Sequence, residues 1–360
     1  MITEETSATK LEPPQAAQDA QGAGDILQER KRRVFSKRTL VFLVLALAII
    51  CFLVSQINVK QTAQALSGAD VSLVLLSAFF YLCSNFFKSV RFNILLRDSG
   101  ISVPKMFAIS GYQNFFNQIM PARTGELTFL YYTKTMAQVK TAASLHALLV
   151  SRMFDLVMIA AFFVFCLLLL KGTEASPALL VAAVFLVIAS LAVAVKMPWF
   201  VSICRRLFNF IISASKISDK PLVQKISGKV NMLAEDFSAI KMKSIMPSLT
   251  FVSAAVWMCL YAFSYTTVIA FGVQLGIVES IVGSTGAVLT NVLPINSFGS
   301  FGTLEAGWTG GFMFVGMSMQ DAVTTGFGYH LINFFAAAAI ALVCFVAFAV
   351  AKRLRDRRPA

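Results

Sequence analysis

Charged residues and histidines are scarce in this chain of 360 residues. Asp, Glu, Lys and Arg together make up 14% of the sequence, and the only histidines are His146 and His330. No third nitrogen or thiolate ligand stands at a spacing typical of a metal site, so we predict neither a metal nor another cofactor. No Gly-rich segment is followed by Lys-Ser or Lys-Thr, which excludes a nucleotide-binding P-loop.

Cysteines are also few, and none of them is arranged as a pair. The sequence contains no C-x-x-C motif, and five of its six cysteines lie in apolar runs. This pattern argues against a disulfide framework and is typical of inert packing residues. The cysteines are Cys51, Cys83, Cys166, Cys204, Cys259 and Cys344.

Apolar residues, in contrast, are abundant and form long runs. They account for 57% of the chain, and several runs are long enough for a helix to cross a bilayer core of about 30 Å. We therefore predict an all-α polytopic membrane protein with about six full spans. The predicted spans cover residues 39–55, 71–90, 142–170, 178–196, 248–272 and 322–350.

Two further apolar regions, residues 104–138 and 277–318, are interrupted by Pro and Gly near their middle. Each is predicted to form two short helices that meet at a break, because Pro and Gly disfavour the interior of a helix. Such a pair either re-enters on the side from which it came or crosses the membrane fully. The pattern leaves both forms open.

Basic residues carry the formal charge of +13, and they lie between the apolar runs. They form no basic amphipathic face and no nucleic-acid-binding motif, so we interpret them as topology signals and expect no nucleic-acid partner. With the amino terminus in the cytoplasm, only Lys60 and Lys171 fall outside, whereas Lys88 and Arg91 fall inside with the other basic residues. The prediction is a multi-pass protein of the cytoplasmic (inner) membrane with both termini in the cytoplasm.

With the same assignment of inside and outside, the break near residue 121 enters the membrane from the cytoplasmic side. The break near residue 294 enters it from the opposite side. Two broken helix pairs that enter from opposite sides are the signature of an inverted repeat. A short internal alignment agrees with this interpretation. It pairs Pro121 with Pro294, Glu126 with Glu305, Arg152 with His330 and Asp155 with Asn333.

Outside the spans, the sequence predicts two tails and one insertion. Residues 1–38 form a polar, disordered tail that ends in the basic segment RKRRVFSKR, and residues 351–360 form a basic cytoplasmic tail. Within the transmembrane domain, residues 39–350, the segment 198–247 is predicted to be a cytoplasmic amphipathic helical insertion. The first apolar run also resembles a signal peptide, but the cleavage-like AQA at 63–65 lies too far beyond it, so we expect an uncleaved span.

The two breaks form the centre of the candidate site. Backbone that leaves a helix at membrane depth must be buried in protein or line a wet cavity, and the free N–H groups of helix starts favour phosphate or carboxylate. Glu126 and Glu305 follow the breaks, where each either caps the helix dipole or faces a ligand. The residues that form the breaks, with the polar groups beside them, are Asn117, Pro121, Gly125, Pro294, Ser297, Gly299 and Gly302.

Charged residues inside a span complete the predicted site. Arg152 lies about 15 Å into its helix at 1.5 Å per residue, at a depth where an ionisable residue indicates function. Asp155 shares its helical face, so the two either neutralise each other or bind a substrate. His330 is either a core residue or part of the site. We predict that Arg123 and Arg152 are the only basic side chains in the interior of the spans, where they bind a lipid phosphate.

Four segments in this order carry a resemblance to a known family. They are PARTGE (121–126), SRMFD (151–155), LPINSFGSFGTLEAG (293–307) and a closing helix after VGMSMQDAV. The chain is similar to the lysylphosphatidylglycerol synthase transmembrane-region family, also called flippase-like membrane proteins. The resemblance implies a domain that moves an amphiphilic lipid between leaflets, either aminoacylated phosphatidylglycerol or an isoprenoid-linked or hopanoid-related lipid. It also implies that the polar positions of the family correspond to Arg123, Glu126, Arg152, Asp155 and Glu305.

The sequence departs from the family pattern at two points. Larger members append a soluble aminoacyl-transfer domain, whereas this sequence stops at RLRDRRPA, so we expect no synthase activity. His330 stands where the resemblance implies an arginine. This difference weakens the anion binding expected of the second half.

Three functions compete on this sequence. The leading hypothesis is a lipid translocase whose cavity holds a headgroup between two inverted halves, with the carboxylates holding the arginines or binding a cationic headgroup. The alternative is a membrane-embedded enzyme or accessory factor of lipid or cell-envelope glycan synthesis. We do not expect an enzyme, because the chain offers no nucleophile or acid–base pair at a suitable spacing. The third is a scaffold that uses the 198–247 helix. Membrane lipid is the expected partner, and a protein of envelope synthesis would join it under the alternative.

Overall fold

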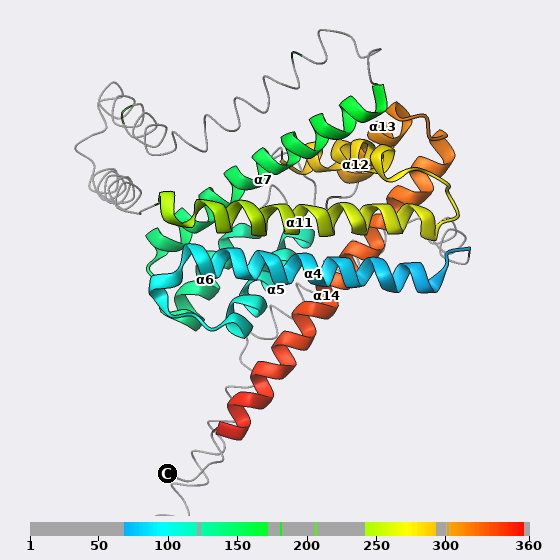
Figure 1. Cartoon of the computed structure of the whole chain (residues 1–360). Helices are drawn as coiled ribbons and strands as arrows, with labels where there is room; N and C mark the ends of the chain where they lie inside the picture. Colours follow the sequence, from blue (N-terminus) through cyan, green and yellow to red (C-terminus); the bar gives the residue numbers. More distant parts are fainter. Residues whose placement is uncertain are drawn as a thin grey trace, which may run out of the picture. The chain divides into compact units, whose positions relative to one another are not determined.

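The computed structural model describes residues 68–120, 124–171, 181, 206, 242–292, 300 and 302–355. In this part of the chain every regular element is a helix, which confirms the predicted all-α class (Figure 1). The elements are α4 (Val71–Leu95), the 3-10 helix η1 (Arg97–Ser99), α5 (Val103–Ile119), α6 (Glu126–Ala137), α7 (Thr141–Lys171), α11 (Met242–Ala270), α12 (Ile277–Val292), α13 (Thr303–Phe314) and α14 (Met319–Arg355).

Within the described residues, four helices are long and apolar enough to cross a membrane, namely α4, α7, α11 and α14. They coincide with the predicted spans at 71–90, 142–170, 248–272 and 322–350, so the chain is a polytopic membrane protein. Other predictions lie outside the described residues: the tail 1–38, the spans 39–55 and 178–196, and nearly all of the insertion 198–247.

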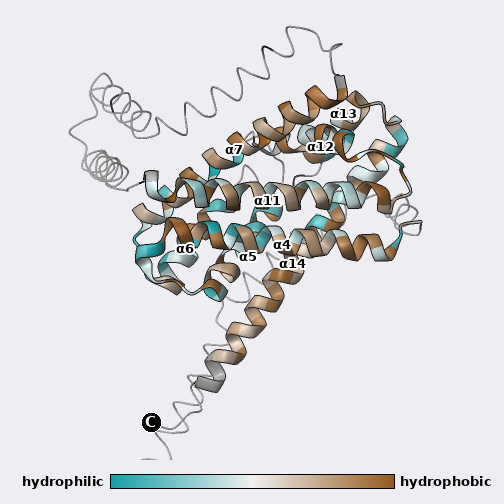
Figure 2. Ribbon diagram, viewed as in Figure 1, coloured by the Kyte–Doolittle hydropathy of each residue, from teal (hydrophilic) through white to brown (hydrophobic). Residues whose placement is uncertain are grey.

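Helix α4, the first of the four described spans, has its polar side chains on the inside of the helix bundle. Ser84, Asn85 and Ser89 are fully buried, whereas Val71 and Phe79 are 71% and 55% exposed. Figure 2 shows hydrophilic residues near the middle of α4 and hydrophobic residues along most of α14. An apolar outer surface with a polar interior is the reverse of a water-soluble helix. It is the arrangement expected where lipid covers the outside and the interior contains a polar site.

Each interrupted region folds into two short helices. In the first, α5 has 17 residues and α6 has 12. In the second, α12 has 16 residues and α13 has 12. None of the four reaches the roughly 20 residues needed for a full span. The predicted division of both regions into helix pairs is therefore confirmed.

The helices fall into two sets with the same order of long, short, short and long: α4 to α7, and α11 to α14. The backbone N–H of Asp70, at the start of α4, donates to the carbonyl oxygen of Ala270, at the end of α11, at 2.8 Å. The two helices therefore pack side by side in opposite directions (Figure 1). In each half, one short helix packs on a long helix of the other half: α5 packs on α14, and α12 packs on α7. This arrangement agrees with the predicted inverted repeat.

Candidate functional site

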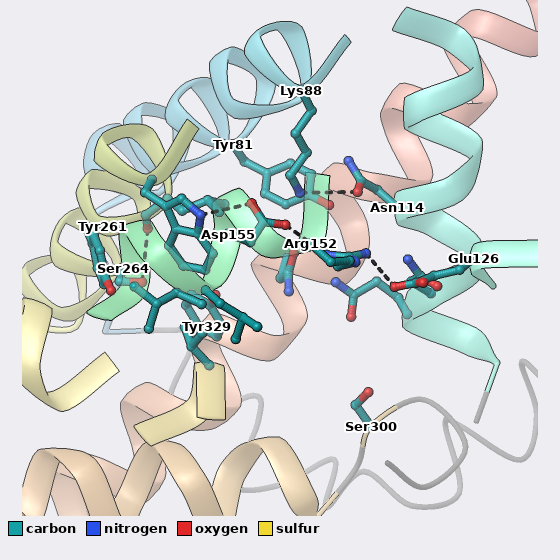
Figure 3. Close-up of a pocket in the computed structure, with 18 residues that line it drawn as sticks. Tyr81, Lys88, Asn114, Glu126, Arg152, Asp155, Tyr261, Ser264, Ser300 and Tyr329 are labelled. Carbon is teal, nitrogen blue, oxygen red and sulfur yellow. Dashed lines mark hydrogen bonds and ion pairs between the residues drawn. The ribbon is translucent and has the colours of Figure 1, made fainter. Parts of the chain in front are cut away.

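A cavity of about 390 Å³ lies between the two sets of helices (Figure 3). Its wall includes residues from α4, α5, α6, α7, α11, α12 and α14, together with Ser300. The lining residues are Tyr81, Lys88, Asn114, Asn117, Gln118, Glu126, Arg152, Asp155, Leu156, Ile159, Trp257, Leu260, Tyr261, Ser264, Val288, Ser300, Tyr329 and Asn333.

Residues beside both breaks reach this one cavity. Asn117 and Gln118, at the end of α5, line it from the first half, and Ser300, just before α13, lines it from the second. This agrees with the prediction that the broken backbone faces an internal cavity. Other residues predicted for the breaks lie outside the described residues, namely Pro121, Arg123, Pro294, Ser297 and Gly299.

Arg152 on α7 carries the ion pairs at the centre of the cavity. One guanidinium nitrogen, Nη2, lies 2.6 Å from Oε1 of Glu126, and the other, Nη1, donates to Oδ2 of Asp155 at 3.1 Å. The Arg152 side chain is 34% exposed. The structure thus brings together three residues that the sequence predicted as a site, and it links α6 to α7 through them.

Gly125 explains how Glu126 comes to this position. A Cβ atom on Gly125 would overlap the backbone nitrogen of Asn117, so the first turn of α6 lies directly against the end of α5. Only glycine allows such a close backbone approach. Glu126 is the next residue and the first of α6, where its charge also favours the positive end of the helix dipole.

Asp155 connects Arg152 to a buried cluster of side chains. Its Oδ1 accepts hydrogen bonds from Nη1 of Arg91 at 2.7 Å and from Nε1 of Trp257 at 3.0 Å. Arg91 also donates to Oγ of Ser253 at 3.3 Å. Because Trp257 and Ser253 belong to α11, this buried cluster joins the first half of the repeat to the second.

The prediction that Arg123 and Arg152 are the only basic side chains inside the spans is wrong. Arg91 is only 1% exposed, and Lys88 lines the cavity. Lys88 already lies within the predicted span 71–90, and Arg91 joins it because α4 continues to Leu95, beyond the predicted end of the span. They were instead interpreted as topology signals.

A sequence signal for these two residues was present. Ser84, Lys88 and Arg91 recur at spacings of four and three residues, which places them on one face of a helix with Asn85 beside them. In the structure Nζ of Lys88 donates to Oδ1 of Asn114 at 3.3 Å. The Nδ2 of Asn114 in turn donates to Oδ1 of Asn85 at 2.8 Å. A polar stripe on an otherwise apolar span therefore indicated the cavity wall.

The second half contains a corresponding pair, Glu305 and His330. Glu305 is the third residue of α13, and its Oε2 accepts the backbone N–H of Gly302 at 2.8 Å. Gly302 has a φ of +81°, which favours glycine at this cap. The capping role considered for Glu305 is therefore present. Its Oε1 lies 2.6 Å from Nδ1 of His330, and the two residues are 7% and 1% exposed.

These contacts agree with the internal alignment of the halves at the residues that the structure describes, which leaves out Pro121 and Pro294. Glu126 pairs with Arg152 as Glu305 pairs with His330, in both cases at 2.6 Å. Arg152 lies eleven residues after the start of α7 at Thr141, and His330 lies eleven after the start of α14 at Met319. Asp155 and Asn333, three residues further on, both line the cavity. Glu305 and His330 lie behind its wall.

Aromatic and hydroxyl groups line the end of the cavity away from Glu126. In Figure 3, Tyr261, Ser264 and Tyr329 lie opposite Glu126, with Arg152 and Asp155 between them. The hydroxyl oxygen of Tyr261 lies 3.2 Å from Oγ1 of Thr285. The cavity thus combines a charged end with a largely aromatic end, which suits a ligand that is itself amphiphilic. Among the described residues, no group of three His, Cys, Asp or Glu side chains could hold a metal ion.

The fold and the cavity define a helical membrane protein built from two inverted halves around a polar site. The chain belongs to the lysylphosphatidylglycerol synthase TM region family, whose pattern matches residues 39–350. This match confirms the predicted family and places the chain among membrane proteins involved in lipid handling. The comparison with curated proteins gave no match.

Proposed function

We propose that the protein moves an amphiphilic lipid with an anionic headgroup between the two leaflets, without chemical change to the lipid. The observation that carries the proposal is Arg152, a charged side chain on the wall of an intramembrane cavity, held between Glu126 and Asp155. Residues with charge at this depth are costly and mark substrate pathways. The aminoacylated or isoprenoid-linked lipids implied by the family resemblance fall within this class.

Arg152 has capacity for one more acceptor. Its Nε is buried, and within the described part of the chain no hydrogen-bond partner reaches it. A headgroup phosphate entering the cavity would accept from this nitrogen and displace Glu126 from Nη2. Charge-assisted hydrogen bonds of this kind are strong in a site that excludes water, so they offset part of the hydration that the phosphate loses.

Asp155 and Glu126 would respond differently to this ligand. Asp155 is also bonded to Arg91 and Trp257, so it keeps its position when a phosphate approaches. Glu126 belongs to the short helix α6 and is the carboxylate that the phosphate replaces. Among the described residues of the cavity and its ion pairs, Lys88, Arg91 and Arg152 carry three positive charges against the two negative charges of Glu126 and Asp155. An anionic headgroup would therefore complete the charge balance of the cavity.

The inverted repeat supplies a route for the movement. Two halves that run in opposite directions around one site can expose that site first to one leaflet and then to the other. Glu126 and Ser300 lie beside the two breaks, so a shift of either short-helix pair would reshape the cavity wall. The aromatic end, with Trp257, Tyr261 and Tyr329, would accommodate the less polar part of the lipid.

The test is lipid movement by the purified full chain in liposomes. A fluorescent phosphatidylglycerol is placed in one leaflet, its transfer is followed by a membrane-impermeant quencher, and its mass is checked afterwards. We expect Arg152→Ala to slow transfer strongly and Arg152→Lys to retain part of it, because lysine lacks the planar two-pronged donor geometry.

Arg97→Ala is the matched control, because Arg97 is 56% exposed in η1, away from the cavity. It should move the probe at the parental rate. Parental transfer by Arg152→Ala at normal abundance would show that Arg152 is structural. A change in the mass of the probe would instead support the enzyme alternative.

A further inference from the structure

The two corresponding pairs differ in one chemical respect. Arg152 keeps its positive charge at any physiological pH, so the Glu126–Arg152 contact is a permanent ion pair. An imidazole ordinarily changes charge between about pH 5 and pH 8, so the Glu305–His330 contact is an ion pair only when His330 is protonated. The second half therefore has a titratable group at the position where the first half has a fixed charge.

Burial makes this difference consequential. His330 and Glu305 are 1% and 7% exposed, and His330 lies about 16 Å along α14 at 1.5 Å per residue. An ionised carboxylate buried without an opposite charge is costly. One proton on His330 would convert the pair from a net negative charge to a neutral ion pair, which stabilises the packing of α13 against α14.

The surrounding elements contribute few groups that titrate in the same range. Glu305 is the only titratable residue of α13, and α12 contributes only Glu279, in its first turn. The packed helices α4, α5, α11 and α14 contribute Tyr, Cys, Lys and Arg side chains, and acids only at helix starts. Ordinary Tyr, Lys and Arg side chains do not change charge between about pH 5 and pH 8. The groups are Asp70, Tyr81, Cys83, Lys88, Arg91, Lys105, Tyr112, Lys243, Cys259, Tyr261, Tyr265, Asp321, Tyr329, Cys344, Lys352, Arg353 and Arg355.

The pair is also connected to the cavity. Glu305 holds the backbone N–H of Gly302 through its Oε2 and His330 through its Oε1. Gly302 is two residues from Ser300, which lines the cavity beside the second break. On the other side of the pair, Asn333 follows His330 by one helical turn and also lines the cavity. A change of charge at the pair would therefore act on two parts of the cavity wall.

From this geometry we propose that Glu305 and His330 form a proton-binding site that couples lipid movement to a proton gradient. The imidazole of His330 takes up one proton in one state of the cavity and releases it in the other, with Asn333 on the route between the cavity and the pair. Coupling rests on the proposed function, whereas proton binding at the pair does not. The two are tested separately.

Proton binding is measured on the full chain by nuclear magnetic resonance of ¹⁵N-labelled histidine in lipid nanodiscs. The chain has only two histidines, so in the variant His146→Gln every histidine signal comes from His330. Spectra are compared between about pH 5 and pH 8, the range in which an ordinary imidazole changes charge. We expect the His330 signal to change with pH, and we expect Glu305→Gln to alter that change. A His330 signal that does not change over this range would overturn the proposal.

Coupling is measured in liposomes with the fluorescent phosphatidylglycerol and an entrapped pH indicator. The readout is the ratio of transfer rates with and without an imposed pH gradient. We expect a several-fold ratio and proton flux for the parental chain and for the control His146→Gln. Both His330→Gln and His330→Arg should bring the ratio to one, since neither side chain exchanges a proton in this range.

The outcomes separate the two proposals. A ratio of one in a parental chain that still moves lipid would overturn coupling and leave the proposed function intact. A response of the transfer rate to the pH gradient that persists in both His330 variants would also overturn coupling at His330 and leave the proposed function intact. If the chain moves no lipid although His330 titrates, the proposed function fails and the proton-binding site stands.

Discussion

The two halves of this molecule share a backbone plan but differ in chemistry. In the first half, Glu126, Arg152 and Asp155 line the cavity. In the second, Glu305 and His330 lie behind the wall, and Asn333 is uncharged. Symmetry of the fold therefore does not imply symmetry of the site. One half has fixed charges on the cavity wall, and the other has a buried carboxylate–imidazole pair.

The halves also differ in how their short helices pack. In the second half, α12 and α13 approach backbone to backbone, because Cβ atoms on Gly286 and Gly311 would overlap carbonyl oxygens of the facing helix. In the first half, among the described residues, α5 and α6 approach this closely only where they meet, because a Cβ on Gly125 would overlap the backbone nitrogen of Asn117. The second pair is thus built as a tighter unit than the first.

The largest difference between the halves should appear when Asp155 and Asn333 are each replaced by leucine. Asp155→Leu leaves Arg91 buried without its counter-ion, so we expect it to lower the free energy of unfolding by about 3–5 kcal/mol. Asn333→Leu should have little effect, because among the described residues no hydrogen-bond partner reaches its buried Oδ1. Denaturant unfolding in detergent measures both. Equal destabilisation would contradict the comparison.

A second replacement sharpens this result. Adding Arg91→Met to Asp155→Leu removes both buried charges and should restore much of the lost stability. Adding Arg152→Met to Asp155→Leu should restore little, because Arg91 then remains buried opposite a leucine. Restoration by Arg152→Met alone would show that Arg152, and not Arg91, is the partner that Asp155 neutralises.

Making the first half resemble the second is the next test. In Arg152→His, transfer of fluorescent phosphatidylglycerol near pH 8 should fall about tenfold or more, because a neutral imidazole forms no charge-assisted hydrogen bonds to phosphate. Transfer should recover in part near pH 5.5, where the imidazole becomes charged. Arg152→Lys is the control and should show no such recovery relative to the parental chain. A pH-independent loss in Arg152→His would indicate a steric effect.

The glycine contact of α12 with α13 gives a smaller expected effect. Gly286→Ala places a methyl group against Gly307 and Gly311, and overpacking of this kind costs about 1–3 kcal/mol. Gly310→Ala is the matched control, because no atom lies within 4 Å of its added Cβ. It should be neutral or stabilising, since alanine is the better helix former. Thermal unfolding of both variants tests the tight packing of this pair.

The smallest effect concerns Asp70, whose backbone N–H joins the two halves and whose carboxyl caps the start of α4. Hydrogen bonds from Oγ and N of Ser72 and from N of Leu73 hold the pKa of the exposed Asp70 carboxyl below its ordinary value. A lowered pKa in the folded state means that this cap stabilises α4 above the pKa of the unfolded chain. The contribution is lost as the pH falls through the folded-state pKa. We expect Asp70→Ala to lower the melting temperature slightly near neutral pH, and to converge with the parental chain in acid.

Much of the fold could be predicted because its signals are local. Run length and composition predicted the four described spans, and Pro and Gly located both interruptions before α6 and α13. The internal alignment predicted which residues correspond, and the contacts Glu126–Arg152 and Glu305–His330 agree with it. Such features depend on the order of residues along one helix or turn. No knowledge of the neighbouring helices is needed to recognise them.

The sequence by itself thus determined a helical membrane protein with two broken helix pairs in opposite orientation, because hydrophobic length and helix-breaking residues are properties of short segments. Only the tertiary structure decided which charges form the site. Arg91 and Asp155 are 64 residues apart, and Trp257 is 102 residues from Asp155. The depth and partner of a side chain depend on which helices pack around it. From the sequence alone, Arg91 is therefore interpreted as a topology signal. In the folded protein it is the buried ion-pair partner of Asp155.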